Sequence, residues 1–274
     1  MMLHLSMQIM SLNSGSNGNV YYFGSGQESI LVDAGLSCKE IEKRMMLTGL
    51  SLRDIGGIFI THEHSDHIFG LKTLVKKFSI PVYITTKTLE SAHLDLPPDL
   101  IRHFNSGDTI HVGKFRVTAF PIQHDASDPH GFFITHSGKA AGVFNDIGIV
   151  CDQVKQYFSQ CHAAFLECNY DEEMLMRGPY PPYLKDRIKG PKGHLSNKEA
   201  LELFRKHRSD QLSCLWLSHL SEHNNDPNLV EKLFTEEQSG IQILIAERKR
   251  QGPLIDLSND RAVTEVKSGQ LSLF

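Results

Sequence analysis

Residues 61–67 read Thr-His-Glu-His-Ser-Asp-His, and this polar run constrains the chain more than any other segment. It follows the short apolar run Gly57–Thr61, which is too brief for a helix and predicts a buried strand ending at the polar residues. A helix N-terminus capped by Asp66 would explain one residue and leave the histidines without a role. Imidazole and carboxylate groups bind zinc, manganese and iron, and a loop can wrap them around a cation. The run therefore predicts a metal site with four ligands: His62, His64, Asp66 and His67.

The remaining ligands of a two-metal site are expected at the ends of other strands, facing the same rim. Three residues follow predicted strands in this way: His124, Asp146 and His219. Each one, taken alone, is more often a hydrogen-bonded surface group than a ligand. Together with the 61–67 run, their shared position indicates ligands, and a carboxylate at Asp146 is suited to bridge two ions. Two divalent ions ~3.5–4 Å apart would share a hydroxide that attacks the substrate.

Short predicted strands alternate with helices along the chain, and no linker or low-complexity stretch interrupts the pattern. The segments Ser37–Glu40 and Ser196–Glu199 have the capping-box pattern that opens a helix, and a further helix is expected over Ile68–Phe78. With 274 residues, of which 40% are hydrophobic, the chain can bury a substantial core. We therefore expect one layered α/β domain over residues 1–274, while periodicity alone leaves a doubly wound sheet open.

The net charge of −4 excludes a general electrostatic attraction to nucleic acid. A phosphate-bearing substrate would therefore need a local basic patch or the metal ions. No run approaches the ~18 apolar residues of a membrane span, and Met1–Met10 lacks the pattern of a secretion signal. The five cysteines form no Cys-x-x-Cys pair, which favours reduced thiols. These features predict a cytoplasmic protein that does not enter membranes.

The pattern Thr-His-x-His-x-Asp-His after a strand, followed by His, Asp and His at later strand ends, resembles that of the metallo-β-lactamase superfamily. The resemblance implies a four-layer αββα sandwich with the site along one edge of the two sheets. It also implies a role for each residue. The first ion would be held by His62, His64 and His124. The second would be held by Asp66, His67 and His219, with Asp146 bridging the two.

Further stretches are similar to the YycJ/WalJ-like subgroup of this superfamily: Ser14–Asn19, Leu31–Gly35, Gly178–Tyr180, Gly193–Asn197 and His219–Asn225. This resemblance implies a metal-dependent exonuclease that acts on DNA ends with zinc or manganese, iron being a third candidate. Two positions depart from the subgroup pattern. Asn145 stands where Thr or Ser is usual, and His223 stands where Glu is common. Neither departure removes a predicted ligand.

His194 is the candidate general acid, on a glycine-flanked loop before the second capping box. In phosphodiesterase branches of the superfamily, a histidine between the bridging aspartate and the last histidine protonates the leaving oxygen or contacts the phosphate. A general acid of this kind typically contributes ~10²–10⁴-fold. A histidine that only bridges local loops is the alternative. Asp66 is a second candidate for proton transfer. The resemblance favours a phosphodiesterase and leaves open a carbon-centred hydrolase acting on a thioester or lactone, because one fold hosts several reactions.

Substrate contacts are expected from two loops. Backbone amides and hydroxyls of the first loop could cradle a terminal phosphate, and basic residues before His194 could pair with backbone phosphates. A tight turn and a solvated basic loop are the alternatives. Tyr180 and Tyr183 are candidates for stacking on bases, with packing under their loop as the alternative. The substrate-binding candidates are Ser14, Ser16, Asn17, Lys192 and Ser196.

Overall fold

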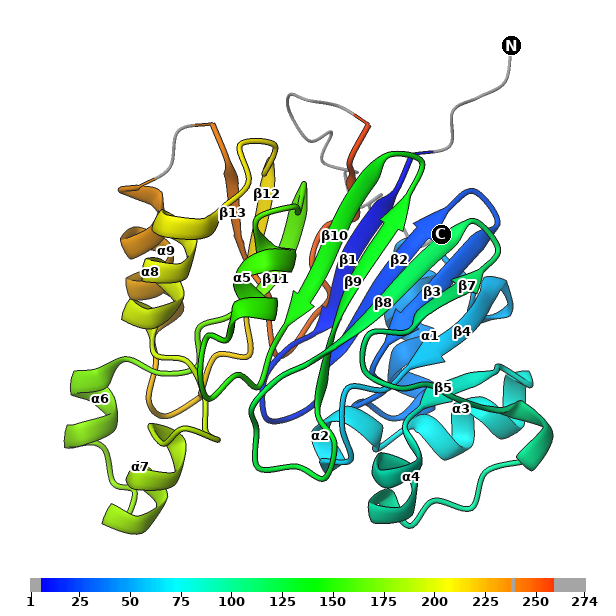
Figure 1. The fold of residues 1–274 in the computed structure, drawn as a ribbon, viewed down its shortest axis with the longest axis horizontal. Helices are drawn as coiled ribbons and strands as arrows, with labels where there is room; N and C mark the ends of the chain where they lie inside the picture. Colours follow the sequence, from blue (N-terminus) through cyan, green and yellow to red (C-terminus); the bar gives the residue numbers. More distant parts are fainter. Residues whose placement is uncertain (1–5, 238–239, 259–274) are drawn as a thin grey trace, which may run out of the picture.

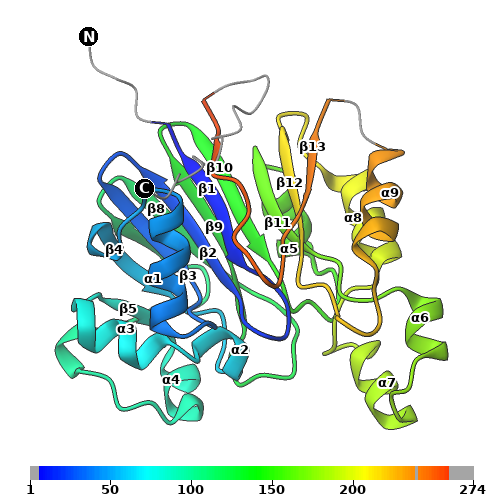
Figure 2. The same ribbon diagram turned by 180° about the vertical axis from the view of Figure 1, so that it is seen from behind.

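The computed structural model of the chain describes residues 6–237 and 240–258. Two seven-stranded mixed sheets face each other, and helices cover the outer face of each (Figures 1 and 2). This confirms the predicted four-layer αββα sandwich and rules out a single doubly wound sheet. The prediction of one domain over residues 1–274 extends outside the described residues and stays a prediction. No helix of the described segments is both long and apolar enough to span a membrane.

The first sheet combines an antiparallel amino-terminal part with a parallel part. In spatial order its strands are β14 (Ile255–Asp256), β1 (Gln8–Asn13), β2 (Val20–Ser25), β3 (Glu28–Val32), β4 (Ile55–Phe59), β5 (Val82–Ile84) and β6 (Ile101–His103). Its outer face is covered by α1 (Cys38–Leu47) and α3 (Leu71–Phe78) (Figure 2). The parallel strands β3 to β6 direct their carboxyl ends to one edge of the sandwich.

The second sheet repeats this mixture in the carboxyl-terminal half. In spatial order its strands are β13 (Gln242–Ile245), β12 (Cys214–Ser218), β11 (Ala163–Glu167), β10 (Lys139–Phe144), β9 (His130–His136), β8 (Phe115–Pro121) and β7 (Thr109–Val112). Three helices lie outside it: α5 (Asp152–Phe158), α8 (Asn197–His207) and α9 (Pro227–Thr235) (Figure 1). Its parallel strands β10 to β13 also end at the edge where the first sheet's parallel strands end.

The core between the sheets is rich in aromatic side chains that are fully buried. Phe59 of the first sheet packs edge-on against Phe132 of the second, with ring centroids 5.6 Å apart. Tyr21 and Phe165 bridge the same gap at 4.6 Å. Burial of such a side chain stabilises the fold by ~1.5–3 kcal/mol. The two sheets are therefore held rigidly against each other, which fixes the relative positions of the loops at their common edge.

The prediction of one helix over Ile68–Phe78 was wrong in its first turn. A short helix, α2 (Ser65–Ile68), ends before Gly70, and α3 begins after it. The Gly70 amide donates to the Ala34 carbonyl at 2.8 Å, and a β-carbon at Gly70 would lie 2.0 Å from a backbone oxygen of residue 36. This close backbone contact lies where the first helix ends. It holds the loop that carries the polar run against the segment between β3 and α1.

Short helices flank the edge where the parallel strands end. On one side lie α2 and α4 (Thr86–Ala92), and on the other α6 (Glu172–Arg177) and α7 (Pro182–Ile188) project away from the sheets (Figures 1 and 2). Two single-turn 3₁₀ helices, Leu52–Asp54 and Pro98–Leu100, precede β4 and β6. The site at this edge is therefore bordered by short elements that carry little of the core.

Candidate metal centre

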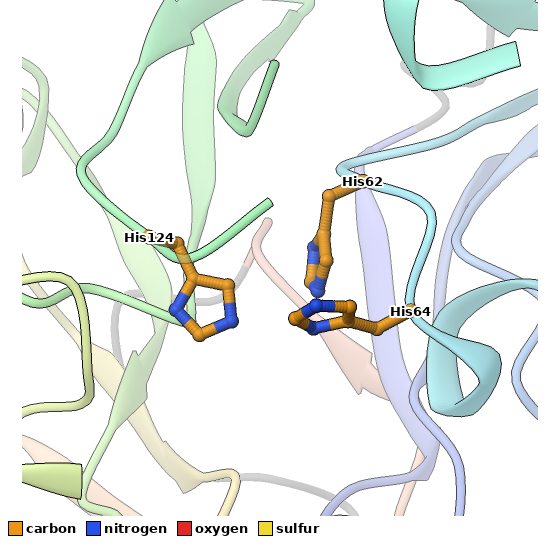
Figure 3. A group of neighbouring side chains, drawn as sticks. All are labelled: His62, His64 and His124. Carbon is orange, nitrogen blue, oxygen red and sulfur yellow. The ribbon is translucent and has the colours of Figure 1, made fainter. Parts of the chain in front are cut away.

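The loops that follow β4 and β8 bring three imidazoles together. Figure 3 shows the rings of His62, His64 and His124 pointing toward one another. The ring centroid of His62 lies 4.6 Å from that of His64 and 5.1 Å from that of His124. One nitrogen from each of the three rings lies within 4.8 Å of the others, a spacing that can hold a single cation. These are the residues that the resemblance implies for the first ion.

A second group of candidate ligands lies beside the first. Asp66, His67 and His219 each offer a ligand atom within 4.8 Å of the others. Asp146 lies between the two groups, with its Oδ2 3.2 Å from His67 Nε2 and its Oδ1 3.7 Å from His124 Nε2. The structure thus brings together all seven residues predicted as ligands, and it places the aspartate where a carboxylate could bridge two ions.

On the first-sheet side, hydrogen bonds at Nδ1 fix the orientation of two rings. His62 Nδ1 lies 3.0 Å from Thr61 Oγ1, and His67 Nδ1 donates to Asp33 Oδ2 at 2.7 Å. Asp33 is itself held by the Thr61 amide and hydroxyl, at 2.9 to 3.0 Å. Both rings consequently present Nε2 to the cluster, as expected of histidines oriented for metal binding by a neighbouring polar group.

On the second-sheet side, the same arrangement holds two more rings. His124 Nδ1 donates to the Gly193 carbonyl at 3.0 Å, and His219 Nδ1 donates to Glu167 Oε1 at 2.9 Å. Asn169 Nδ2 also donates to the His219 carbonyl, at 2.9 Å. Four histidines from the two sheets are therefore each held at Nδ1 and present Nε2 to the cluster, where the Nε2 of His67 also lies 3.1 Å from Asn19 Nδ2.

Three buried atoms of the cluster test whether the site fits a metal. His62 Nε2, Asp146 Oδ2 and His219 Nε2 are buried and make no hydrogen bond with any of the described residues. An unpaired buried polar group costs ~1–3 kcal/mol, so such groups are rare unless a ligand satisfies them. The unpaired atoms face a cluster of nitrogen and oxygen donors, which suits divalent cations. The residues present therefore fit divalent metal ions.

The electrostatics of the cluster are dominated by burial and by neighbouring charges. Burial lowers the pKa of His62, and the neighbouring imidazoles lower it further, so this ring is neutral and able to donate a lone pair. Burial alone would lower the pKa of His219 too, but Asp146, Asp66 and Glu167 raise it to about 10. A protonated ring must lose its proton to bind a cation, so ion binding at this position releases a proton.

Two supporting carboxylates, Asp33 and Glu167, were not predicted as site residues. Glu167 ends β11, is fully buried, and accepts from the Ile147 amide at 2.8 Å as well as from His219. Burial alone would raise its pKa, yet His194 and His219 hold the pKa of this carboxyl well below its usual range. The sequence contained a signal, because both residues end strand-like runs as the ligands do.

Backbone conformation also marks the centre. Asp33, Asp146 and His219 have φ values of 61°, 56° and 55°, in the left-handed region that non-glycine residues rarely adopt. Each such residue costs on the order of 1–3 kcal/mol and persists where the surrounding structure enforces it. Asp33 and His219 directly follow β3 and β12, and Asp146 lies two residues past the end of β10, so the left-handed backbone turns these side chains from the strand direction into the site.

The loop that carries Asp66 is pressed against two other segments. The Asn19 amide donates to the Asp66 carbonyl at 2.7 Å, and Asn19 Nδ2 donates to Asp66 Oδ2 at 3.2 Å. A β-carbon at Gly35 would lie 1.7 Å from the same carbonyl oxygen. Only glycine therefore permits the approach that positions this aspartate. Burial would raise the pKa of Asp66, but His67 and His219 hold it well below its usual range.

His194 lies on the wall of a cavity of about 240 Å³ that opens beside the cluster. Its Nδ1 donates to Glu167 Oε1 at 2.7 Å and lies 3.5 Å from Asp146 Oδ1. Its side chain is 20% exposed, so its other nitrogen has access to a substrate in the cavity. The predicted general acid and the predicted ligands therefore share one site. Asp66 lines the same cavity.

The five predicted substrate-binding residues fall into different places. Ser16 is exposed and lines the cavity, whereas Asn17 is exposed and donates to the backbone of residue 248. Ser14 is buried, and its Oγ accepts the His219 amide at 2.7 Å, so it supports a candidate ligand from behind. Ser196 is buried as the N-cap of α8 in a capping box. Lys192 is exposed and is not among the described residues that line the cavity.

Comparison with known proteins places this fold and this cluster in one family. The family described as "Beta-lactamase superfamily domain" matches residues 28–215. The chain belongs to this superfamily. Within it, the chain is 36% identical over 246 residues to exodeoxyribonuclease YycJ of Bacillus anthracis. The aligned region covers 87% of this chain and 92% of that protein. The resemblance inferred from the motifs is thereby confirmed.

Two further relatives of the superfamily agree with this assignment. Exodeoxyribonuclease WalJ of Streptococcus pneumoniae is 32% identical over 86% of this chain and 90% of its own length. The crystal structure of YhfI, a metallo-β-lactamase fold protein of Bacillus subtilis, matches with a TM-score of 0.70 over 90% of this chain and 99% of that chain, at 18% identity. The WalJ alignment supports membership of the family, and the YhfI structure supports the fold alone. The chain is thus a hydrolase of the metallo-β-lactamase fold.

Proposed function

We propose that this protein is a metal-dependent nuclease that holds two divalent ions, zinc or manganese with iron as a third candidate, and cleaves phosphodiester bonds at DNA ends. The observation that carries the proposal is the convergence of seven candidate ligands, three of which have buried atoms without a hydrogen bond among the described residues. His62, His64 and His124 would hold one ion. The other would be held by Asp66, His67 and His219, with Asp146 shared between them.

The bound ions would polarise the phosphodiester and lower the pKa of a water nucleophile. The chain's own residues would supply the remaining steps. His194 is directed by Glu167 and would donate a proton from Nε2 to the leaving oxygen. Glu167 would stabilise the imidazolium form, since its carboxylate accepts the Nδ1 proton at 2.7 Å. Asp66 would act as a ligand, its low pKa leaving it ionised and a poor proton donor.

The preference for DNA is supported by the relatives rather than by the cluster. Two relatives that align with most of this chain are named exodeoxyribonucleases. Ser16 on the cavity wall and the exposed Lys192, next to the cavity-lining Gly193, would contact the phosphates flanking the cleaved bond, while Asn17 would act only as an outer contact. Ser14 and Ser196 are engaged in the fold and are not part of this proposal. A cytoplasmic location is part of the same proposal.

The experiment that tests this function uses the purified chain loaded with Mn²⁺ or Zn²⁺ and end-labelled DNA. We expect stepwise shortening of the DNA that stops on chelation and resumes when the metal is restored. His64→Ala should retain the fold by circular dichroism and lose the nuclease activity. A folded His64→Ala protein with full activity would contradict the proposal. Thioester and lactone substrates assayed in parallel distinguish the carbon-centred alternative, which predicts turnover of these compounds and none of DNA.

A further inference from the structure

Tyr180 lies in the turn between α6 and α7, and its side chain lines the cavity beside His194. The turn reads Pro179-Tyr180-Pro181-Pro182. Proline fixes its own φ and restricts the residue before it, so the backbone around the tyrosine has few conformations to lose on binding. The ring is therefore held on the cavity wall by a stiff segment.

This turn is fastened to the loop that follows His219. The Asp171 amide donates to the Asn224 carbonyl at 2.8 Å, and a β-carbon at Gly178 would lie 2.9 Å from Asn224 Oδ1. The Tyr180 ring contacts the ring of His223, with centroids 6.1 Å apart and planes at 76°. The position of the tyrosine is thus coupled to the same loop as a candidate metal ligand.

The contact with His223 is edge-on, so the two rings do not stack face to face. Among residues 6–237 and 240–258, Tyr180 has no face-to-face aromatic partner. An unstacked ring on the wall of a binding cavity is suited to a flat ligand, because every nucleobase has a π-face and stacking on tyrosine tolerates any base. Tyr183, three residues later, is 75% exposed and does not line the cavity.

The rest of the cavity suits the phosphate and sugar attached to such a base. One part of the wall is the imidazole and carboxylate cluster, and another is Arg187 of α7, which is ion-paired with Asp125 on the same wall. Lys185 Nζ donates to the Met176 carbonyl at 2.7 Å and ties α7 to α6. A volume of about 240 Å³ lies below the ~300–1,000 Å³ of ordinary ligand pockets, which favours one nucleotide over a base pair.

We propose that Tyr180 stacks on the base of the nucleotide whose phosphodiester bond lies at the metal cluster, and that it thereby selects an unpaired terminal nucleotide. This inference rests on the proposed nuclease function. It adds a substrate class to that function: single strands, overhangs and frayed ends, bound without base preference.

The test compares binding of metal-loaded protein to single-stranded oligonucleotides with a non-hydrolysable terminal linkage. One oligonucleotide carries 2-aminopurine at the terminal position, and a second carries an abasic site there. Tyr180→Leu should weaken binding of the first by about tenfold and remove the quenching of 2-aminopurine fluorescence, because base stacking on an aromatic ring is lost. Tyr180→Phe should bind and quench like the wild type, and Tyr183→Leu is the matched control that should do the same.

The abasic oligonucleotide separates stacking from general damage. Wild type and Tyr180→Leu should bind it equally, since there is no base to stack. Two results would overturn the role of Tyr180 and leave the nuclease function intact. In one, Tyr180→Leu weakens the binding of both oligonucleotides equally; in the other, it leaves the quenching of 2-aminopurine unchanged. Failure of the wild-type protein to cleave any DNA would overturn the proposed function and this inference together, a result that the cleavage assay identifies separately.

Discussion

The two sheets build the metal centre in different ways. The first sheet supplies its candidate ligands from one continuous loop after β4, as four residues within six positions: His62, His64, Asp66 and His67. The second sheet supplies its ligands singly, each after a different strand: His124, Asp146 and His219. The first set is local, and a chain of any fold could bring it together. The second set meets only when the strand order is correct.

This difference shows in the supporting structure. On the first-sheet side the loop is held by close backbone contacts, such as the Asn19 amide on the Asp66 carbonyl at 2.7 Å. On the second-sheet side two of the three ligands, Asp146 and His219, adopt left-handed φ values. The candidate ligands in the loop after β4 therefore depend on tight loop packing. The candidate ligands of the second sheet depend instead on strained residues that the packed sheets hold in place.

The largest effect on turnover is expected from Asp146→Asn. This variant tests the candidate ligands of the second sheet at the residue that lies between the two candidate ion sites. Loss of one charged oxygen weakens the binding of both ions, so turnover should fall by more than the ~10²–10⁴-fold that loss of a general acid costs. Metal content measured by mass spectrometry should fall at both positions. The control is Asp152→Asn, at the first position of α5 with a fully exposed side chain. Two retained ions in folded Asp146→Asn would show that this carboxylate does not bridge.

The next effect is expected from His194→Ala, which removes no predicted ligand. Turnover should fall by ~10²–10⁴-fold while the metal content stays unchanged. A substrate with a good leaving group, such as a nitrophenyl phosphodiester, should be affected much less than DNA because its leaving oxygen needs no proton. An equal loss on both substrates would contradict the general-acid role and favour a role in binding.

The ligand loop was readable from the sequence because all of its chemistry lies in seven consecutive residues. The strand-end ligands were predicted from their position after apolar runs, and the structure brings them to the same edge. The orienting roles of Asp33 and Glu167 could not be predicted, because a carboxylate after a strand can bind a metal, hold a histidine or face water. Only the partner distances of 2.7 Å to His67 and 2.9 Å to His219 distinguish these cases.

The strands and the longer helices could be predicted because they carry strong patterns, whereas their arrangement as a sandwich followed from the family resemblance, since periodicity alone left a doubly wound sheet open. The short helices α4, α6 and α7 have only six or seven residues, which is fewer than two turns, so they show no resolvable periodicity. The substrate roles given to Ser14 and Ser196 show another limit. Hydroxyls on glycine-rich loops and at helix starts serve the fold as readily as a ligand, and burial, which is a property of the tertiary structure, determines which role they have.

Smaller effects are expected from removing the charge of Asp33 or of Glu167, the two carboxylates that orient histidines. The two substitutions should differ in their effect on the pH profile of turnover. Asp33→Asn removes the negative charge of the carboxylate that accepts the His67 Nδ1 proton, and we expect the second ion to bind ~10–100-fold more weakly. Glu167→Gln should weaken the same ion through His219 and also alter the pH profile of turnover, because Glu167 contacts His194 as well. Isothermal titration with Zn²⁺ and pH-dependent rates measure the two outcomes. A pH profile changed by Asp33→Asn and unchanged by Glu167→Gln would contradict this assignment.

The smallest effect is expected from Gly35→Ala, which tests whether the local ligand set depends on loop packing. A methyl group there would meet the Asp66 carbonyl oxygen at 1.7 Å, so the loop must move, at a cost of ~1–3 kcal/mol in unfolding free energy. The matched control is Gly49→Ala, where φ is 76° and no atom lies within 4 Å. That variant should lose ~1–2 kcal/mol through its left-handed backbone alone. Both variants therefore destabilise by similar amounts in urea, but only Gly35→Ala should bind the second ion more weakly. Unchanged metal affinity in Gly35→Ala would show that the loop holds Asp66 in place without this contact.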